Sequence, residues 1–229
     1  MIAALDVPTA AQARKLVEEL GDAVRFYKIG LELSTSGGYH ELLDWLVKRG
    51  KRVFCDLKLY DIPETVRRAV ANLRGRGVSF LTVHGDRAIM AAAAKEKGDI
   101  GILAVTVLTS LDQRDLEEMG YRGTAGELVP QLVLQRAGSA LAAGCDGVIA
   151  SGLEAAGIKS KYGANLLVVT PGIRPAGGDT ADQKRSVDVA QAFRNGADYI
   201  VVGRPIRDAK NPAAAAEAIQ ATIAEVFSS

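Results

Sequence analysis

The sequence predicts an α/β protein with the TIM (β/α)8 barrel fold, formed by a single domain over residues 1–229. Eight short apolar segments alternate with longer amphipathic segments along the whole chain. The apolar segments are nearly continuous in Val, Ile, Leu and Phe, which is typical of parallel strands that are buried on both faces. No linker interrupts the alternation, and barrels of this length routinely form one domain.

Each apolar segment is followed by a polar or glycine-containing turn, where a strand is expected to end. We therefore expect strands at residues 2–7, 25–30, 52–59, 80–85, 101–108, 147–151, 166–173 and 199–204. A doubly wound open sheet is the alternative fold. It would more often carry a glycine-rich GxGxxG turn after its first strand, and the segment LDVPTA contains no glycine.

The first helix is expected at residues 9–20. Thr9 and Gln12 match the spacing of a capping box at its start, and Gly21 is a typical residue for its end. Its apolar face is formed by Ala13, Leu16, Val17 and Leu20.

Two further segments show the same helical pattern. Residues 64–73 repeat the apolar spacing of the first helix, and Gly75 follows them. Asn211 and Pro212 are typical first residues for the last helix, which runs to residue 227. Strands and helices therefore alternate to the end of the chain.

The composition excludes several classes of function. A net charge of +1 at pH 7 provides no general attraction to nucleic acid or to anionic membranes. No apolar run reaches the roughly 18 residues of a membrane span, and the N-terminus lacks the basic region of a signal peptide, so we expect a cytoplasmic protein. Cys55 and Cys145 lie in separate apolar segments without a CxxC motif, which predicts two reduced core residues.

Polar residues stand at the C-terminal ends of most expected strands. They are Asp6, Lys28, Asp56, Lys58, His84, Thr109, Arg174 and Arg204. In a barrel these ends meet at one mouth, so the side chains should converge there. Because buried charges are costly unless they are paired, the four acids and lysines of this set predict a functional site.

Asp56 and Lys58 are two positions apart, so they should share one face of their strand with Cα atoms ~7 Å apart. Each ion of such a pair keeps the other charged. The alternative interpretation is a structural ion pair that seals the end of the barrel. We expect His84 to be a hydrogen-bonded residue of the barrel rather than a metal ligand.

Asp61 follows the third strand within the sequence DIPET. With Pro63 in the first turn and Glu64 three residues later, this sequence predicts a helix start with Asp61 as its N-cap. Thr65 lies one helical turn after Asp61, so the hydroxyl and the carboxylate could also bind a polyhydroxylated ligand together. The spacing alone leaves both interpretations open.

The last two strands are followed by residues that suit an anion. The loops after strands seven and eight of TIM barrels commonly bind phosphate. Gly203 would let the backbone approach such a ligand, and Arg204 offers two donors from one guanidinium. Arg174 and Gln183 belong to a glycine-containing segment that we interpret as a flap over residues 174–185. The alternative is that Arg204 is an ordinary surface arginine.

With these residues in place, the whole chain resembles the orotidine 5'-phosphate decarboxylase family. The block DLKLYDIPET, which matches DxKxxDIPxT, is the most specific part of the resemblance. Weaker motifs follow the same order as in the family: ALD, KIG, AVTVLTS, TPGIR and VVGRPI. The segments LTS and GIRPAGGDTADQKR are similar to those of the bacterial branch.

The resemblance implies decarboxylation of orotidine 5'-monophosphate to uridine 5'-monophosphate without a metal or an organic cofactor. Lys58 would donate the proton to carbon 6 of the pyrimidine as carbon dioxide leaves, with Asp56 near the departing carboxylate. Asp6 and Lys28 would contact the ribose, and Lys28 would also belong to the charged network.

The resemblance also implies the remaining contacts. Thr109, or Ser110 beside it, would contact the base. Phosphate would be bound by Arg174, Gln183, Gly203 and Arg204. The family forms homodimers, in which Asp61 and Thr65 would complete the site of the neighbouring subunit.

Two alternative functions follow from the same residues. A magnesium-dependent sugar-phosphate synthase or decarboxylase of the same superfamily would be similar at DxK and at the phosphate site. A non-catalytic barrel that binds a phosphorylated ligand is the alternative from another class. The sequence DIPET and the segment LTS favour the nucleotide decarboxylase.

Overall fold

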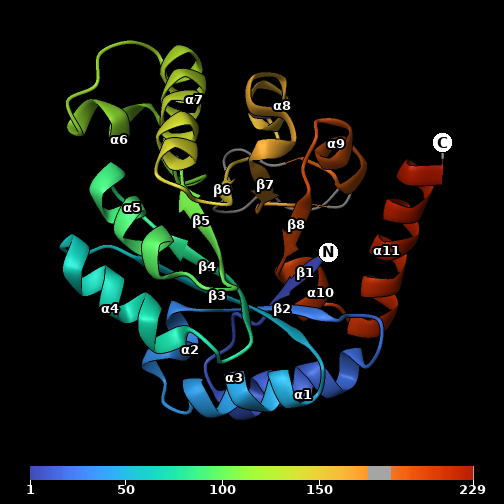
Figure 1. Ribbon diagram of the computed structural model, residues 1–229. Helices are drawn as coiled ribbons and strands as arrows, with labels where there is room; N and C mark the ends of the chain where they lie inside the picture. The colour runs from blue at the N-terminus through green and yellow to red at the C-terminus, as the bar shows by residue number, and fades with distance from the viewer. Residues whose placement is uncertain (175–186, 229) are drawn as a thin grey trace.

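The computed structural model describes residues 1–174 and 187–228. Its centre is a closed barrel of parallel strands in which each strand pairs with the next along the chain and the last pairs with the first (Figure 1). The strands are β1 Ile2–Ala4, β2 Phe26–Gly30, β3 Arg52–Leu59, β4 Val78–Val83, β5 Gly101–Val105, β6 Gly147–Ile149, β7 Leu167–Thr170 and β8 Tyr199–Val202. The predicted (β/α)8 barrel is therefore confirmed, and the open sheet is excluded.

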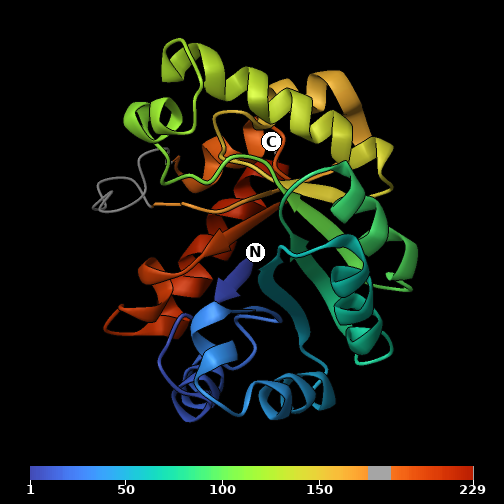
Figure 2. The same ribbon diagram turned by 90° about the vertical axis from the view of Figure 1, so that its left-hand side faces the viewer.

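Helices form an outer layer around the strands (Figures 1 and 2). The longer ones are α1 Ala10–Leu20, α3 Tyr39–Lys48, α4 Pro63–Leu73, α5 Arg87–Glu96, α7 Ala125–Ala142, α8 Ala155–Tyr162 and α11 Pro212–Ser228. Shorter ones are α2 Leu31–Thr35, α6 Gln113–Glu118, α9 Val189–Arg194, α10 Arg204–Arg207 and the 3-10 turn η1 Gly163–Asn165. None of the helices in the described ranges is long and apolar enough to cross a membrane.

Several strands end earlier than their apolar sequences suggest. The segment predicted at 2–7 forms a strand only at Ile2–Ala4, and the segment at 101–108 only at Gly101–Val105. Leu5 and Val107 lie beyond these strand ends but are still buried. The apolar pattern therefore reports burial at the barrel mouth, where the chain has already left the sheet.

The first and last helices begin at the predicted caps. The Thr9 hydroxyl accepts a hydrogen bond from the Gln12 amide at 3.2 Å, and Gly21 ends α1 with a φ of 51°. The Gln12 side chain accepts from the Thr9 hydroxyl, so the reciprocal contact of a capping box is replaced by a side-chain bond. At the last helix, the side-chain oxygen Oδ1 of Asn211 accepts from the Ala214 amide at 3.1 Å.

Two apolar clusters form the core of the part of the chain that the structure describes. The larger lies between the strands and the helices, and it includes Cys55 and Cys145, which are free and buried as predicted. The smaller belongs to the inside of the barrel and includes Ala4, Phe26, Phe54 and Phe80, one residue from each of the first four strands. Two positions after these four residues stand Asp6, Lys28, Asp56 and Thr82, respectively. Because side chains alternate along a strand, these polar residues continue the inward-facing rows to the mouth.

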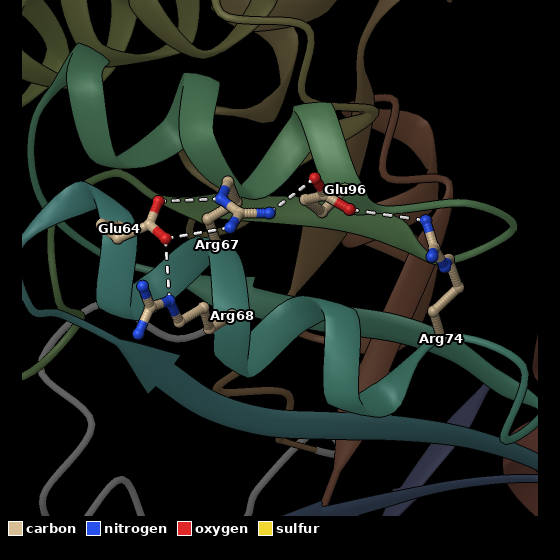
Figure 3. Close-up of polar contacts among 5 residues, drawn as sticks. All are labelled: Glu64, Arg67, Arg68, Arg74 and Glu96. Carbon is tan, nitrogen blue, oxygen red and sulfur yellow. Dashed lines mark hydrogen bonds and ion pairs between the residues drawn. The ribbon is translucent and has the colours of Figure 1, made fainter.

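A chain of ion pairs joins α4 to α5 (Figure 3). Glu64 accepts from Arg67 at 2.8 and 2.9 Å and from Arg68 at 2.8 Å. Arg67 also donates to Glu96 of α5 at 2.8 Å, and Arg74 reaches the other oxygen of Glu96 at 3.4 Å. Hydrogen bonds from Arg67 and Arg68 lower the pKa of Glu64 to about 2. The network fixes α4, the helix that begins within the DLKLYDIPET block, against its neighbour.

Candidate active site

A cavity of about 560 Å3 opens at the C-terminal mouth of the barrel. Most of the residues that the sequence singled out line it: Asp6, Lys28, Asp56, Lys58, Thr109, Ser110, Arg174, Gly203 and Arg204. Apolar side chains from the strands, among them Phe54 and Val201, also line it. The predicted convergence of strand-end residues therefore occurs, and charged groups meet apolar walls in one cavity.

Four charged side chains of alternating sign form a continuous row in this cavity. The Lys28 ammonium lies 2.8 Å from Asp6 Oδ1 and 3.4 Å from Asp56 Oδ2. The Lys58 ammonium lies 2.9 Å from Asp56 Oδ1. Asp56 is therefore shared by two lysines, one on each of its carboxylate oxygens. The predicted pair of Asp56 and Lys58 is confirmed, and it belongs to a larger network.

The network keeps its central members charged. Burial alone would lower the pKa of Lys28, but the neighbouring Asp56 and Asp6 carboxylates outweigh it and raise that pKa. Burial alone would raise the pKa of Asp56, but Lys28, Lys58 and hydrogen bonds from Lys58 and Thr82 outweigh it and lower that pKa. Both groups are thus ionised at neutral pH, although their side chains are only 11% and 13% exposed.

The backbone around Lys58 departs from a regular strand. Lys58 has a φ of 46° and is the one non-glycine residue with positive φ in the described ranges. Backbone in this region costs of order 1–3 kcal/mol for a residue with a side chain. The pairing of β3 with β4 is also irregular between Cys55 and Leu59. Simple alternation along the strand was therefore the wrong reason for the Asp56–Lys58 contact, which forms across a local distortion.

Thr82 of β4 is a residue that the sequence reasoning missed. Its hydroxyl accepts from the Lys58 amide at 2.9 Å and donates to Asp56 Oδ1 at 2.9 Å. The side chain is 0% exposed. Its position two residues after Phe80, in the same register as Asp56 after Phe54, is a signal that could have identified it.

Arg207 is a second lining residue that the sequence did not single out, although it lies three positions after Arg204. Arg207 lines the cavity, and one of its nitrogens donates to the Asp6 carbonyl oxygen at 2.7 Å. This contact ties α10 to the segment just after β1, next to the charged row. Arg204 is the first residue of α10, and Gly203 is its N-cap.

Asp61 and Thr65 do not line the cavity of their own chain. Both are exposed, and Asp61 accepts a hydrogen bond from the Ile62 amide at 2.7 Å. The N-cap of α4 is Ile62, without a side-chain cap, so the prediction of Asp61 as N-cap is wrong. The Glu64 carboxylate accepts hydrogen bonds from Arg67 and Arg68. The local structure therefore gives Asp61 no capping role.

Exposed apolar side chains flank Asp61. Tyr60 is 70% and Ile62 is 67% exposed, which is unusual for such large side chains on either side of a carboxylate. Tyr60 also contacts the ring of His84, with the ring centroids 5.5 Å apart.

His84 differs from the prediction of a hydrogen-bonded barrel histidine. Its Nδ1 atom is buried and has no hydrogen-bond partner in the described part of the chain. Burial, together with Arg136 and Lys58, lowers the pKa of His84. The imidazole is therefore neutral at pH 7, and it adds no charge to the row.

The flap expected over residues 174–185 is described only at its first residue. Gln183 and most of the expected flap at 174–185 lie outside the described residues. Arg174 is described, and its backbone amide donates to the Val187 carbonyl at 3.1 Å. In the described ranges, no group of three or more His, Cys, Asp or Glu side chains is arranged to hold a metal ion.

Comparisons with known proteins agree with this geometry. The model of the Orotidine 5'-phosphate decarboxylase / HUMPS family matches residues 1–219. A protein of Methylococcus capsulatus named orotidine 5'-phosphate decarboxylase is 58% identical over 99% of this chain and 93% of its own length. A protein of the same name from Stenotrophomonas maltophilia is 52% identical over the same shares.

A solved structure has the same architecture. The crystal structure of orotidine 5'-phosphate decarboxylase from Lactobacillus acidophilus superimposes with a TM-score of 0.84 at 35% sequence identity. The match covers 97% of both chains. The similarity therefore includes the complete barrel.

Proposed function

The chain belongs to the orotidine 5'-phosphate decarboxylase / HUMPS family, and we propose the roles by which its residues convert orotidine 5'-monophosphate into uridine 5'-monophosphate and carbon dioxide in pyrimidine biosynthesis. Lys58 is the proton donor in this proposal. The observation that supports it is the ammonium of Lys58, 2.9 Å from Asp56 in a cavity at the barrel mouth.

The chemistry requires a fixed positive charge. Loss of carbon dioxide leaves an electron pair at carbon 6 of the pyrimidine, which the ring delocalises poorly. Barrier reductions near the top of the enzymatic range, ~20 kcal/mol, are needed for such a step. An ammonium held at carbon 6 stabilises the negative charge that develops in the transition state and then transfers its proton to carbon.

Asp56 and Lys28 prepare Lys58 for this role. Asp56 holds the Lys58 ammonium, and Lys28 holds the second oxygen of Asp56. In the proposal the departing carboxylate leaves from a position near Asp56. The row ends at Asp6, which together with Lys28 would bind the ribose hydroxyls.

The remaining lining residues suggest how the substrate lies in the cavity. Thr109 or Ser110, after β5, would contact the pyrimidine. Arg174 and Arg204 would bind the phosphate with backbone at Gly203, and Gln183 would add a contact from the expected flap. Both arginines and Gly203 line the same cavity as the charged row, which supports one ligand that spans both ends.

We propose that the active enzyme is a homodimer in which Asp61 and Thr65 complete the partner's site. Both residues are exposed and neither lines the cavity of its own chain. The exposed Tyr60 and Ile62 beside Asp61 offer apolar surface for a subunit contact. A carboxylate and a hydroxyl at the edge of such a contact can reach a ligand in the neighbouring cavity.

A magnesium-dependent reaction on a sugar phosphate is the alternative within the superfamily. Such an enzyme needs carboxylates at this mouth that can bind a divalent cation. Both Asp6 and Asp56 are already in contact with lysine ammonium groups, which favours the proposed reaction.

The role of Lys58 is tested with Lys58→Ala. The variant is expected to lose at least about 1,000-fold in kcat, because a fixed charge and the proton donor are both removed. It should still bind uridine 5'-monophosphate, measured by calorimetry, because the phosphate contacts remain. A variant that retains wild-type turnover would show that another group protonates carbon 6.

A further inference from the structure

Thr82 lies in β4 beside the irregular part of β3 and contacts both ends of the Asp56–Lys58 pair. Its hydroxyl accepts from the Lys58 amide and donates to Asp56 Oδ1, each at 2.9 Å. The same Oδ1 atom accepts from the Lys58 ammonium at 2.9 Å. The contacts form a closed ring that runs from the Lys58 backbone through Thr82 and Asp56 to the Lys58 side chain.

We propose that Thr82 is a positioning residue for the decarboxylation, which holds the Lys58 ammonium and the Asp56 carboxylate in their reactive arrangement. The inference rests on the proposed role of Lys58 as proton donor. Thr82 itself does not line the cavity, so it would act through these two residues.

The strand pairing explains why Lys58 needs a side-chain partner. Cys55 pairs with Leu81 and Leu59 pairs with Val83, so three residues of β3, 56–58, stand opposite the single residue 82 of β4. A regular ladder cannot supply an acceptor for every amide in such a segment. The Thr82 hydroxyl supplies one to Lys58, whose backbone has a φ of 46°. The hydroxyl thus stabilises the unusual backbone from which the ammonium projects.

The same hydroxyl fixes the direction of the Asp56 carboxylate. Oδ1 accepts from Thr82 and from Lys58, and Oδ2 faces Lys28 at 3.4 Å. Each carboxylate oxygen of Asp56 therefore has its own partners, and the carboxylate cannot rotate without breaking a contact. Because Thr82 is 0% exposed, water cannot easily replace its hydroxyl.

A threonine suits this position better than other small residues. Its β-branched side chain has few χ1 rotamers, so the hydroxyl stays where both partners need it. Thr82→Val keeps the shape but leaves the Lys58 amide and Asp56 Oδ1 each without one partner. Thr82→Ser keeps the hydroxyl and loses only a methyl group. The pair of variants separates hydrogen bonding from packing.

The experiment compares kcat, KM and pH profiles of these variants with orotidine 5'-monophosphate as substrate. Thr82→Val is expected to lower kcat by about 10- to 100-fold, since misplacement of a catalytic group by ~1 Å has an effect of this size. KM should change less than about threefold, because the phosphate contacts are untouched. Thr82→Ser should stay within about fivefold of wild-type kcat.

The pH profile provides a readout that loss of packing would not change. Without the Thr82 hydroxyl, Asp56 loses a hydrogen bond that favours its charged form, so its pKa rises. The acidic limb of kcat should therefore move to higher pH in Thr82→Val and remain unchanged in Thr82→Ser.

Thr170→Val is the matched control. Thr170 ends β7, is 0% exposed, and its hydroxyl has no hydrogen-bond partner among the residues that the structure describes. The same substitution there should leave kcat and the acidic limb unchanged. Thr82→Cys, which keeps a weak donor and acceptor, replaces Thr82→Val if the latter does not fold, with an expected loss in kcat of at least about fivefold.

The inference is overturned if Thr82→Val keeps kcat within about twofold of the wild type, or if Thr82→Ser loses as much as Thr82→Val. It is also overturned if the loss in kcat matches a loss of folded protein. Lys58→Ala distinguishes this failure from failure of the proposed function. If Lys58→Ala is inactive and Thr82→Val has the kcat of the wild type, only the role of Thr82 is refuted. If Lys58→Ala is active, the role of Lys58 is refuted.

Discussion

The substitution Asp56→Asn removes the negative charge that two lysines share. Asp56 lies 2.9 Å from the Lys58 ammonium and 3.4 Å from the Lys28 ammonium, with a side chain that is 13% exposed. At an effective dielectric constant of about 20, each such contact contributes ~5 kcal/mol of attraction before desolvation is counted. Much of that attraction is offset by the cost of burying the carboxylate. Removing one partner from a buried ionic contact nonetheless destabilises a protein by ~3–5 kcal/mol.

We expect the lower end of that range, ~3 kcal/mol, because Lys28 keeps its contact with Asp6 and asparagine can still accept from Thr82. For a domain of this size, that change corresponds to a Tm lower by ~6–12 °C. Differential scanning calorimetry at pH 7 measures it. The matched control is Glu19→Gln, which removes an exposed pair with Lys15 at 3.7 Å and should change the Tm by less than about 2 °C.

The pH dependence of this difference follows from the lowered pKa of Asp56. A carboxyl whose pKa is lowered by folding contributes stability above its unfolded value of about 3.9, and that contribution is lost as the pH falls through the folded pKa. The difference in Tm between wild type and Asp56→Asn should thus be constant from pH 5 to pH 8 and shrink below about pH 4. A Tm of Asp56→Asn equal to or above that of the wild type at pH 7 would refute the argument that Asp56 holds the two lysines.

Three further predictions concern other parts of the molecule. Mixing Asp61→Ala with Lys58→Ala should restore partial activity through hybrid sites, and no recovery after confirmed subunit exchange would contradict a shared site. Burial raises the thiol pKa of Cys55 to about 11 and that of Cys145 to about 12, so neither should react with a thiol reagent at pH 8 until the protein is denatured. Glu64→Gln should leave kcat unchanged and lower the Tm by less than about a third of the shift expected for Asp56→Asn, because its ion pairs are exposed.

The fold could be predicted because burial on both faces leaves a clear trace in the sequence. The third strand has the predicted bounds, Arg52–Leu59, since its apolar run ends where the chain leaves the sheet. At the first and fifth strands the apolar run continues past the sheet, because Leu5 and Val107 remain buried in the loops above it. Apolar patterning reports burial and cannot distinguish a ladder from a buried loop.

The charged row could be predicted because Asp6, Lys28 and Asp56 occupy inward-facing positions at strand ends. The detailed geometry could not. The sequence does not indicate that Lys58 adopts a positive φ, since that conformation depends on the register between β3 and β4. Thr82 is marked in the sequence only by its position two residues after Phe80, because its importance comes from a contact between strands and not from a motif.

For Asp61, the local sequence pattern predicted a role in the helix start that the structure does not show. The sequence DIPET fits a helix N-cap, yet the helix begins one residue later than this requires, and Asp61 accepts from the Ile62 amide outside the helix. Proline is tolerated within the first helical turn, so Pro63 is compatible with either start and local propensity could not decide between them. The exposed position of Asp61, away from the cavity of its own chain, is what makes a role at a neighbouring site worth testing.

The central claim is that the row from Asp6 to Lys58 decarboxylates orotidine 5'-monophosphate without a metal ion. The most direct measurement is the rate of loss of orotidine 5'-monophosphate absorbance, with enzyme that has been dialysed against excess chelator and assayed in its presence. We expect the same kcat as in the presence of magnesium. Activity that disappears in chelator and returns on addition of magnesium would contradict it and favour the magnesium-dependent alternative.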